Sequence, residues 1–227
     1  PSVVFAGEDQ EGIDESTPYP KKFNAHYPRT KAAAERLVLQ ANSPTLSTVA
    51  LRPHLIWGPG DTQLIPRIVK RARAGRMRLV GSGRNLIDAT YVDNAAHAHV
   101  LAVQLLAPDA PCAGKPYFIT NGEPMPFSEI VDDILAAAGL EPLSKSISPR
   151  LAYLAGAMLE AAYTVLRKRD EPPMTRFVAR QFATAHWYNI NAAKQDLGYE
   201  TLVSMQEGMR RLADDFHKSD TMQPAAT

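Results

Sequence analysis

Short apolar segments alternate with longer amphipathic segments along most of the chain. Strand-like runs occur at 3–5, 48–51, 55–57, 77–80, 87–92 and 116–120, and helical spacings of apolar residues cover 24–41, 64–74, 93–106 and 127–138. A strand, a helix and a further strand in succession need a crossover connection, which places the two strands parallel. The pattern therefore predicts an α/β fold in which 3–5, 49–51 and 117–119 share one parallel sheet.

Strands become sparse after residue 120, so we expect two parts. Residues 1–120 should form the sheet-containing part, with a surface loop at 7–22 and with segments at about 60–90 that reach into the second part. Residues 121–220 should form a smaller, mainly helical lobe, which includes helices at 151–166 and 205–216. Residues 221–227 are expected to be a disordered tail.

The helix expected at 151–166 is the most apolar segment of the chain. Glu160 interrupts it and Arg167-Lys168-Arg169 follows it, so the segment does not suit a membrane-spanning helix. A helix that lies on a membrane surface would carry a strong polar face, which this segment lacks. We therefore favour a helix that packs in the core or lines a hydrophobic substrate tunnel over one on a membrane surface.

Charge and cysteine content exclude several classes of protein. The 25 Lys and Arg residues balance 24 Asp and Glu residues, and the basic cluster at 70–78 fits the solvated side of a helix, so we expect no nucleic-acid partner. The single Cys112 excludes a disulfide framework and a cysteine zinc site. His97 and His99 would face different directions on a helix, so no metal site is predicted.

The first residues also carry information. Pro-Ser-Val-Val-Phe has no initiator Met and enters directly into an apolar, β-branched run, as the interior of a domain would. We therefore expect a fragment or a processed product. The alternative is a natural start from which Met has been removed.

Tyr27 and Lys31 form the sharpest candidate for chemistry. Residues four positions apart lie on one face of a helix, so the phenol and the ammonium would point into the same space. A nearby cation favours the phenolate and so suits a tyrosine for proton transfer. Such pairs also arise by chance on exposed helices, so their surroundings decide the interpretation.

Four blocks of residues occur in a fixed order around this pair. They are Tyr27-x-x-x-Lys31 with Glu35-Arg36, Leu51-Arg52-Pro53 with Trp57-Gly58-Pro59-Gly60-Asp61, Gly81-x-Gly83-Arg84-Asn85, and Tyr91-Val92-Asp93-Asn94. In this order and spacing they resemble the extended short-chain dehydrogenases/reductases, in particular the 3β-hydroxysteroid dehydrogenase branch. The resemblance implies the C-terminal part of a doubly wound, Rossmann-type parallel sheet with a mainly helical substrate-binding lobe.

The resemblance also implies what is missing. That family opens with a strand, a Gly-rich turn and a helix that holds the dinucleotide pyrophosphate, and the sequence offers no counterpart. The family's catalytic Ser or Thr would be the residue just upstream of Pro1. We therefore expect the nucleotide-binding half to be absent, one sheet edge to be bare, and the 227-residue chain itself to be inactive.

Site roles follow from the same resemblance. Tyr27 would exchange a proton with the substrate oxygen, and Lys31 would assist it and hold the nicotinamide ribose. Backbone groups at Pro53, His54, Leu55 and Ile56 would meet the nicotinamide, although Arg-Pro turn chemistry explains this loop equally well. Substrate contacts are expected from Trp57, Arg84 and Tyr91; Arg84 would reach a carboxylate or phosphate, and a plain solvated loop position is its alternative.

The resemblance finally implies a bacterial, lipid-metabolising oxidoreductase with NAD(P)(H) as cofactor, NADP or NAD being undecided. The expected substrate is a hydrophobic 3-keto or 3-hydroxy compound, first a 2-alkyl-3-oxoalkanoate and next a 3β-hydroxysteroid or sterol 4α-carboxylate. A non-catalytic NAD(P)-binding sensor or scaffold is the alternative from another class. We expect a cytoplasmic protein, free or peripheral to a membrane, that forms a homodimer or associates with enzymes of its pathway.

Overall fold

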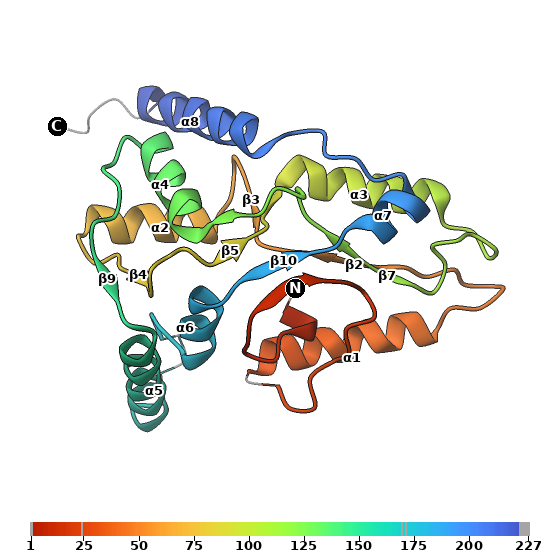
Figure 1. The fold of residues 1–227 in the computed structure, drawn as a ribbon, viewed down its shortest axis with the longest axis horizontal. Helices are drawn as coiled ribbons and strands as arrows, with labels where there is room; N and C mark the ends of the chain where they lie inside the picture. The colour runs from red at the N-terminus through yellow and green to blue at the C-terminus, as the bar shows by residue number, and fades with distance from the viewer. Residues whose placement is uncertain (1, 24, 169, 171, 223–227) are drawn as a thin grey trace.

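The computed structural model describes residues 2–23, 25–168, 170 and 172–222 of the chain (Figure 1). Most of its helices match the predicted ones, whereas α6 was not predicted. The helices are α1 His26–Gln40, α2 Leu64–Arg73, α3 Val92–Leu105, α4 Phe127–Ala137, α5 Pro149–Val165, α6 Arg176–Ala183, α7 Asn191–Leu197 and α8 Met205–Met222. Helix α8 extends past the expected end at 216 and takes in 221–222, and the rest of the expected tail lies outside the described residues.

Strand pairing is almost entirely parallel. Strand β2 (Ala50–Pro53) pairs with β7 (Pro116–Ile119), β3 (Ile56–Trp57) with β6 (Thr90–Tyr91), and β4 (Leu79–Val80) with β9 (Ser146–Ile147). A fourth sheet has the order β1 (Gln10–Ile13), β10 (His186–Tyr188), β5 (Leu86–Ile87) and β8 (Met125–Pro126), and only its β5–β8 pair is antiparallel. The predicted α/β fold with parallel strands is confirmed.

Two predictions for the first residues are wrong. Residues 3–5 do not form a strand: Ser2–Val4 is a short 3-10 helix, η1, whose Val3 and Val4 are buried against α1. Of the three segments expected to share a sheet, only those in β2 and β7 pair. The loop expected at 7–22 contains β1, because its backbone pairs with β10, which lies more than 170 residues away along the chain.

The core consists of two large hydrophobic clusters. The first packs α2, α4 and α8 around Trp57, Ile130 and Leu212. The second surrounds β2 and β7, and it includes Phe118 and Ile119 of β7, both valines of η1, and Tyr199. Both clusters draw on residues from either side of position 120.

Helix α5 lies at the edge of the molecule beside α6, away from both of these clusters (Figure 1). It buries only Ala152 and Gly156, and a Cβ added to Gly156 would lie 2.7 Å from the Thr175 carbonyl carbon. The helix therefore meets the rest of the fold along one narrow stripe, where Ala152 joins Val80 and Ala179 in a third, small hydrophobic cluster and Tyr153 packs against it. Within the described part of the chain, no helix is long and apolar enough to cross a membrane.

Candidate functional site

Helix α1 carries Tyr27 and Lys31 on its outer face. Pro28 lies in the first turn, where its missing N–H is not needed, so the helix begins at His26 as the sequence predicts. Pro28 and Ala32 are buried and face the core, which turns the two neighbouring residues outward. Tyr27 is 62% exposed and Lys31 is exposed as well. The structure thus presents a phenol and an ammonium one helical turn apart on an accessible surface.

A buried ion pair fixes α1 to strand β2. The Glu35 carboxylate accepts from Nε of Arg52 at 3.0 Å and from Nη2 at 2.7 Å, and the two side chains are only 8% and 3% exposed. The hydroxyl of Tyr19 donates to the same carboxylate, and the guanidinium lies over the ring of Phe118. A bidentate contact in this setting fixes both the distance and the rotation of α1 relative to β2.

The turn that follows β2 lies at the same end of the molecule as the start of α1, because the two elements run in opposite directions (Figure 1). Pro53 ends the strand, and Leu55 has a φ of +44°, in the left-handed region. Such a conformation costs a non-glycine residue about 1 kcal/mol and is found most often at functional turns. Ile56 is exposed, whereas His54 points inward.

The side chain of His54 already has a hydrogen-bond partner within the fold. Its Nδ1 donates to the Asp88 carbonyl at 2.9 Å, and burial lowers the pKa of His54 well below its usual value. The backbone groups of His54 also have partners, since its N–H donates to the Ile119 carbonyl at 3.2 Å and its carbonyl accepts from the Thr90 hydroxyl at 2.7 Å.

A buried polar cluster behind this turn was not predicted. Asp88 is 1% exposed, and it accepts from the Thr120 hydroxyl at 2.7 Å and from the Glu123 amide at 3.3 Å. Burial raises the pKa of Asp88 to about 6, and burial lowers the pKa of His186 to about 4. The ring of His186 lies 5.6 Å from that of His54. The available sequence signal was a carboxylate inside an apolar, strand-like run.

Two predicted substrate residues lie in the core instead. Trp57 is 1% and Tyr91 2% exposed, and their rings meet edge to face at 5.3 Å. Helix α8 approaches both rings so closely that a Cβ on Gly208 would lie 2.7 Å from Tyr91 and 2.8 Å from Trp57. Neither side chain presents a surface to a ligand in this arrangement. Arg84 is exposed in the loop between β4 and β5.

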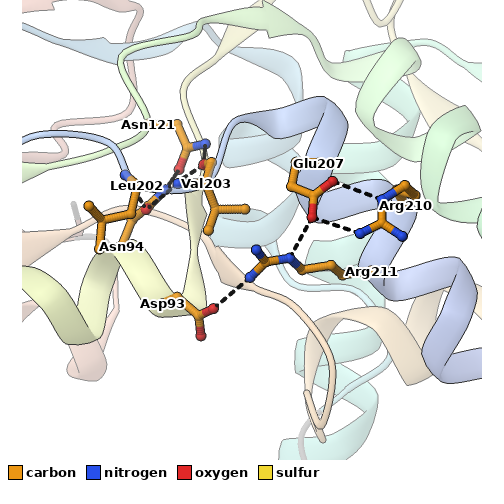
Figure 2. Close-up of polar contacts among 8 residues, drawn as sticks. All are labelled: Asp93, Asn94, Asn121, Leu202, Val203, Glu207, Arg210 and Arg211. Atoms are coloured by element: carbon orange, nitrogen blue, oxygen red, sulfur yellow. Dashed lines mark hydrogen bonds and ion pairs between the residues drawn. The ribbon is translucent and has the colours of Figure 1, made fainter.

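Side-chain amides hold the segment that leads into α8 against α3 (Figure 2). The Oδ1 of Asn94 accepts from the amides of Leu202 and Val203, and its Nδ2 donates to Asn121 and to the Val203 carbonyl. Nearby, Arg211 on α8 reaches the Asp93 carboxylate at 3.1 Å (Figure 2). These contacts fix the C-terminal helix over the first core cluster.

The groups at the start of α1 and after β2 fit the nicotinamide part of a dinucleotide. A phenol and an ammonium suit ribose hydroxyls and a substrate oxygen, and an exposed strand-end turn offers backbone groups for a carboxamide. The Gly-rich turn at 58–60 does not fit the pyrophosphate, because the Asp61 carboxylate already accepts from the amides of Gln63, Leu64 and Ile65 at the start of α2. That helix end would repel a phosphate.

Two hollows lie away from these groups. One, of about 480 Å³, is lined by residues of α5 and α6, among them Glu160, Val165 and Arg176. The other, of about 380 Å³, lies between the end of α2 and the segment 140–145. Neither contains a predicted site residue.

Comparison with known proteins shows which family and which enzymes the chain is similar to. The model of the 3-beta hydroxysteroid dehydrogenase/isomerase family matches residues 2–150. The chain is 56% identical to the 2-alkyl-3-oxoalkanoate reductase of Stenotrophomonas maltophilia over 201 residues, which is 88% of the chain and 61% of that protein. It is 51% identical to the enzyme of the same name from Shewanella oneidensis over 220 residues, with 93% and 57% covered.

More distant relatives include the sterol-4-alpha-carboxylate 3-dehydrogenase, decarboxylating, of Mus musculus, at 38% identity over 95% of the chain and 61% of that protein. The chain spans about three fifths of the length of these curated relatives. Among solved structures, the dTDP-glucose 4,6-dehydratase of Bacillus anthracis in complex with NAD superimposes with a TM-score of 0.62 at 17% identity, covering 97% of this chain and 60% of that one. MoeE5 in complex with UDP-glucuronic acid and NAD gives 0.64 at 20% identity, covering 96% and 63%. At such identities these structures show a shared Rossmann-like fold.

Proposed function

The chain belongs to the 3-beta hydroxysteroid dehydrogenase/isomerase family, and we propose that the protein carrying it is an NAD(P)-dependent oxidoreductase of 3-hydroxy and 3-keto groups on a hydrophobic substrate. One observation carries the proposal. Tyr27 and Lys31 stand exposed on one face of α1, and the buried Glu35–Arg52 pair fixes that face relative to the turn after β2.

Each group has a separate task in the proposed reaction. The reduced nicotinamide, when bound, supplies a hydride to the carbonyl carbon of the substrate. The Tyr27 hydroxyl gives its proton to the carbonyl oxygen, so that the ketone becomes an alcohol. Lys31 favours the phenolate that remains and donates to the ribose hydroxyls. Backbone groups of residues 53–56 orient the nicotinamide ring.

We propose a 2-alkyl-3-oxoalkanoate as the substrate. The relatives at 56% and 51% identity carry that activity in their names, whereas the sterol dehydrogenase stands at 38%. A sterol 4α-carboxylate or a 3β-hydroxysteroid is the second candidate. All three are largely apolar and carry the 3-keto or 3-hydroxy group on which the proposed reaction acts.

Four further assignments are proposed on the same basis. They are the use of NADP or NAD, a contact between Arg84 and a substrate carboxylate, a cytoplasmic location, and a homodimer or an association with enzymes of the pathway. A sensor or scaffold would need neither Tyr27 nor Lys31, so the presence of both favours an enzyme.

The decisive experiment compares Tyr27→Phe with wild type in the protein that carries this chain, using NADH and NADPH with a 2-alkyl-3-oxoalkanoate and a 3-keto steroid. Loss of the proton donor should lower kcat about 10²- to 10⁴-fold and change the cofactor Kd only slightly. Tyr163→Phe on α5 is the matched control and should keep wild-type turnover. A Tyr27→Phe protein with more than half of the wild-type kcat would refute the proposal.

A further inference from the structure

The segment 62–80, which holds α2 and β4, carries cations without acidic neighbours in the sequence. It contains no Asp or Glu, although basic and acidic residues balance at 25 and 24 over the whole chain. Its exposed basic residues are Arg67, Lys70, Arg73, Arg76 and Arg78. Within the part of the chain that the structure describes, none of these five forms an ion pair. Helix α2 and β4 lie near one end of the molecule, away from α1 (Figure 1).

The cations of α2 form a line along the helix. Arg67, Lys70 and Arg73 are three residues apart, so they lie on one side, and the buried residues of α2 lie on the other. Arg76 and Arg78 continue the line in the turn before β4. The dipole of α2 favours cations in its last turn, but Arg67 lies before that turn. The line is therefore longer than the end of the helix requires.

The line leads to the hollow of about 380 Å³ between the end of α2 and the segment 140–145. The apolar residues that line this hollow are Ala72, Met77, Leu140, Pro142 and Leu143. Its exposed cations are Arg73, Arg78 and Lys145, and Glu141 is the one carboxylate that lines it. The guanidinium of Arg78 is held in place, because its Nη1 donates to the Gly75 carbonyl at 2.9 Å and to the Met77 carbonyl at 2.6 Å. An apolar recess thus lies among fixed and unpaired cations.

This combination suits an acidic protein segment better than a phosphate or a nucleic acid. Phosphate sites commonly use the backbone N–H groups at a helix N-terminus, whereas α2 ends here with its carbonyls. Single-stranded nucleic acids stack their bases on aromatic rings, and neither 62–80 nor 140–145 contains an aromatic residue. Neighbouring cations of the line are about 4.5 Å apart along the axis. Glu residues three or four positions apart on a second helix repeat at a similar interval.

We propose that this basic face, formed by α2, the turn 74–78 and the segment 140–145, binds an acidic amphipathic helix of a partner protein. Carboxylates of the partner contact Arg67, Lys70 and Arg73, and one apolar side chain of the partner enters the hollow. Charge complementarity sets the orientation of the helix, and burial of the apolar side chain adds affinity. The proposal goes beyond the reductase function and does not depend on it, because its test measures binding and needs no turnover.

The first test measures the Kd of a labelled helical peptide by fluorescence anisotropy at low salt, with the protein that carries this chain. The peptide has Glu at every third or fourth position and one central Leu. Wild type should bind it about thirtyfold more tightly than the same peptide with Lys in place of Glu. Arg73→Glu/Arg76→Glu should weaken binding about thirtyfold, because attractions become repulsions. The matched control, Lys21→Glu/Lys22→Glu, reverses two exposed cations before α1 and should leave the Kd unchanged.

The second test looks for a gain of affinity, which a misfolded protein cannot produce. Glu141→Lys removes the carboxylate at the hollow and adds a cation, so it should strengthen binding of the Glu peptide about fivefold. Glu200→Lys makes the same change at an exposed position after α7 and should have no effect.

The third test addresses the hollow itself. Replacing the central Leu of the peptide by Ser should weaken binding to wild type about tenfold. Ser144→Trp places a large ring at the lining of the hollow. This variant should bind the Leu and Ser peptides equally and keep its preference for Glu over Lys.

Equal affinities of wild type for the Glu and Lys peptides would overturn the proposal, as would equal losses from the two charge-reversed pairs. An unchanged or weaker Kd for Glu141→Lys would contradict the placement of the partner's carboxylates. Tighter binding of a DNA oligonucleotide than of the Glu peptide would also overturn the proposal, since the face would then serve a nucleic acid.

Discussion

Helices α1 and α5 both expose much of their surface, yet they are attached to the fold in opposite ways. Helix α1 is held through buried Ala32 and the buried Glu35–Arg52 pair, whereas α5 rests on two small residues and a half-exposed Glu160–Arg176 pair. A helix that aims Tyr27 at a reacting atom must have a fixed rotation about its axis. The firm attachment of α1 therefore suits the task proposed for Tyr27, whereas α5 meets the fold along one narrow stripe.

Arg52 offers the most sensitive test of how firmly α1 is attached. Arg52→Ala leaves the Glu35 carboxylate buried without its cation, and such a change costs about 3–5 kcal/mol of unfolding free energy. Urea unfolding measures the loss. Glu35→Leu/Arg52→Met removes both charges and should recover much of it. A loss below 1 kcal/mol for Arg52→Ala would show that the pair does not fix α1.

Gly156 tests the attachment of α5 at its narrowest point. A Cβ at this position would lie 2.7–2.9 Å from backbone atoms of Thr175 and Arg176, which cannot move aside cheaply. Gly156→Ala should therefore cost about 1–3 kcal/mol by overpacking. Hydrogen exchange should rise over 149–183 and stay at wild-type rates in α1. A rise that spreads to α1 would contradict the separate attachment of the two helices.

His186 and Asp88, in the buried cluster behind the turn after β2, should make the unfolding free energy depend on pH in opposite directions. Because burial lowers the pKa of His186 to about 4, its contribution to stability is present above its ordinary value of 6.5 and is lost as pH falls. Because burial raises the pKa of Asp88 from 3.8 to about 6, its contribution is present at low pH and is lost as pH rises toward 6. The two slopes therefore oppose one another between these values.

Two variants separate these contributions. Asp88→Asn should make the unfolding free energy rise more steeply between pH 4 and 6, by about 1.4 kcal/mol per pH unit, and His186→Gln should flatten it by a similar amount. Urea unfolding across this range measures both slopes. Slopes that change in the same direction would contradict the assigned shifts.

The smallest effect is expected at the surface pair of α5. Arg176→Gln removes an ion pair that is open to water on its cationic side, so the urea midpoint should stay within the error of measurement. A shift as large as that of Arg52→Ala would remove the contrast between the two helices.

Periodicity in the sequence was sufficient for most of the helices and for placing Tyr27 and Lys31 on one helix face, because each depends on neighbours three or four residues away. Helix α6 was not predicted. Strand β1 was missed because Gln, Glu and Gly carry no strand signal of their own, and only the distant edge of β10 makes the segment extended. The burial of Trp57 and Tyr91 was missed for a related reason. Helix α8 covers both rings, and Gly208 permits its close approach, a contact that no local pattern encodes.

The clamp around Asn94 has a consequence for how the polypeptide is made. Asn94 and Asn121 bind the backbone at Val203, and the first core cluster is closed by Leu212. A nascent chain synthesised only as far as residue 200 lacks the Val203 carbonyl to which both amides donate, and it leaves an open apolar surface over Trp57. Folding of this part therefore cannot finish on the ribosome until the last helix has emerged. Earlier segments must wait in an incomplete state that chaperones can recognise.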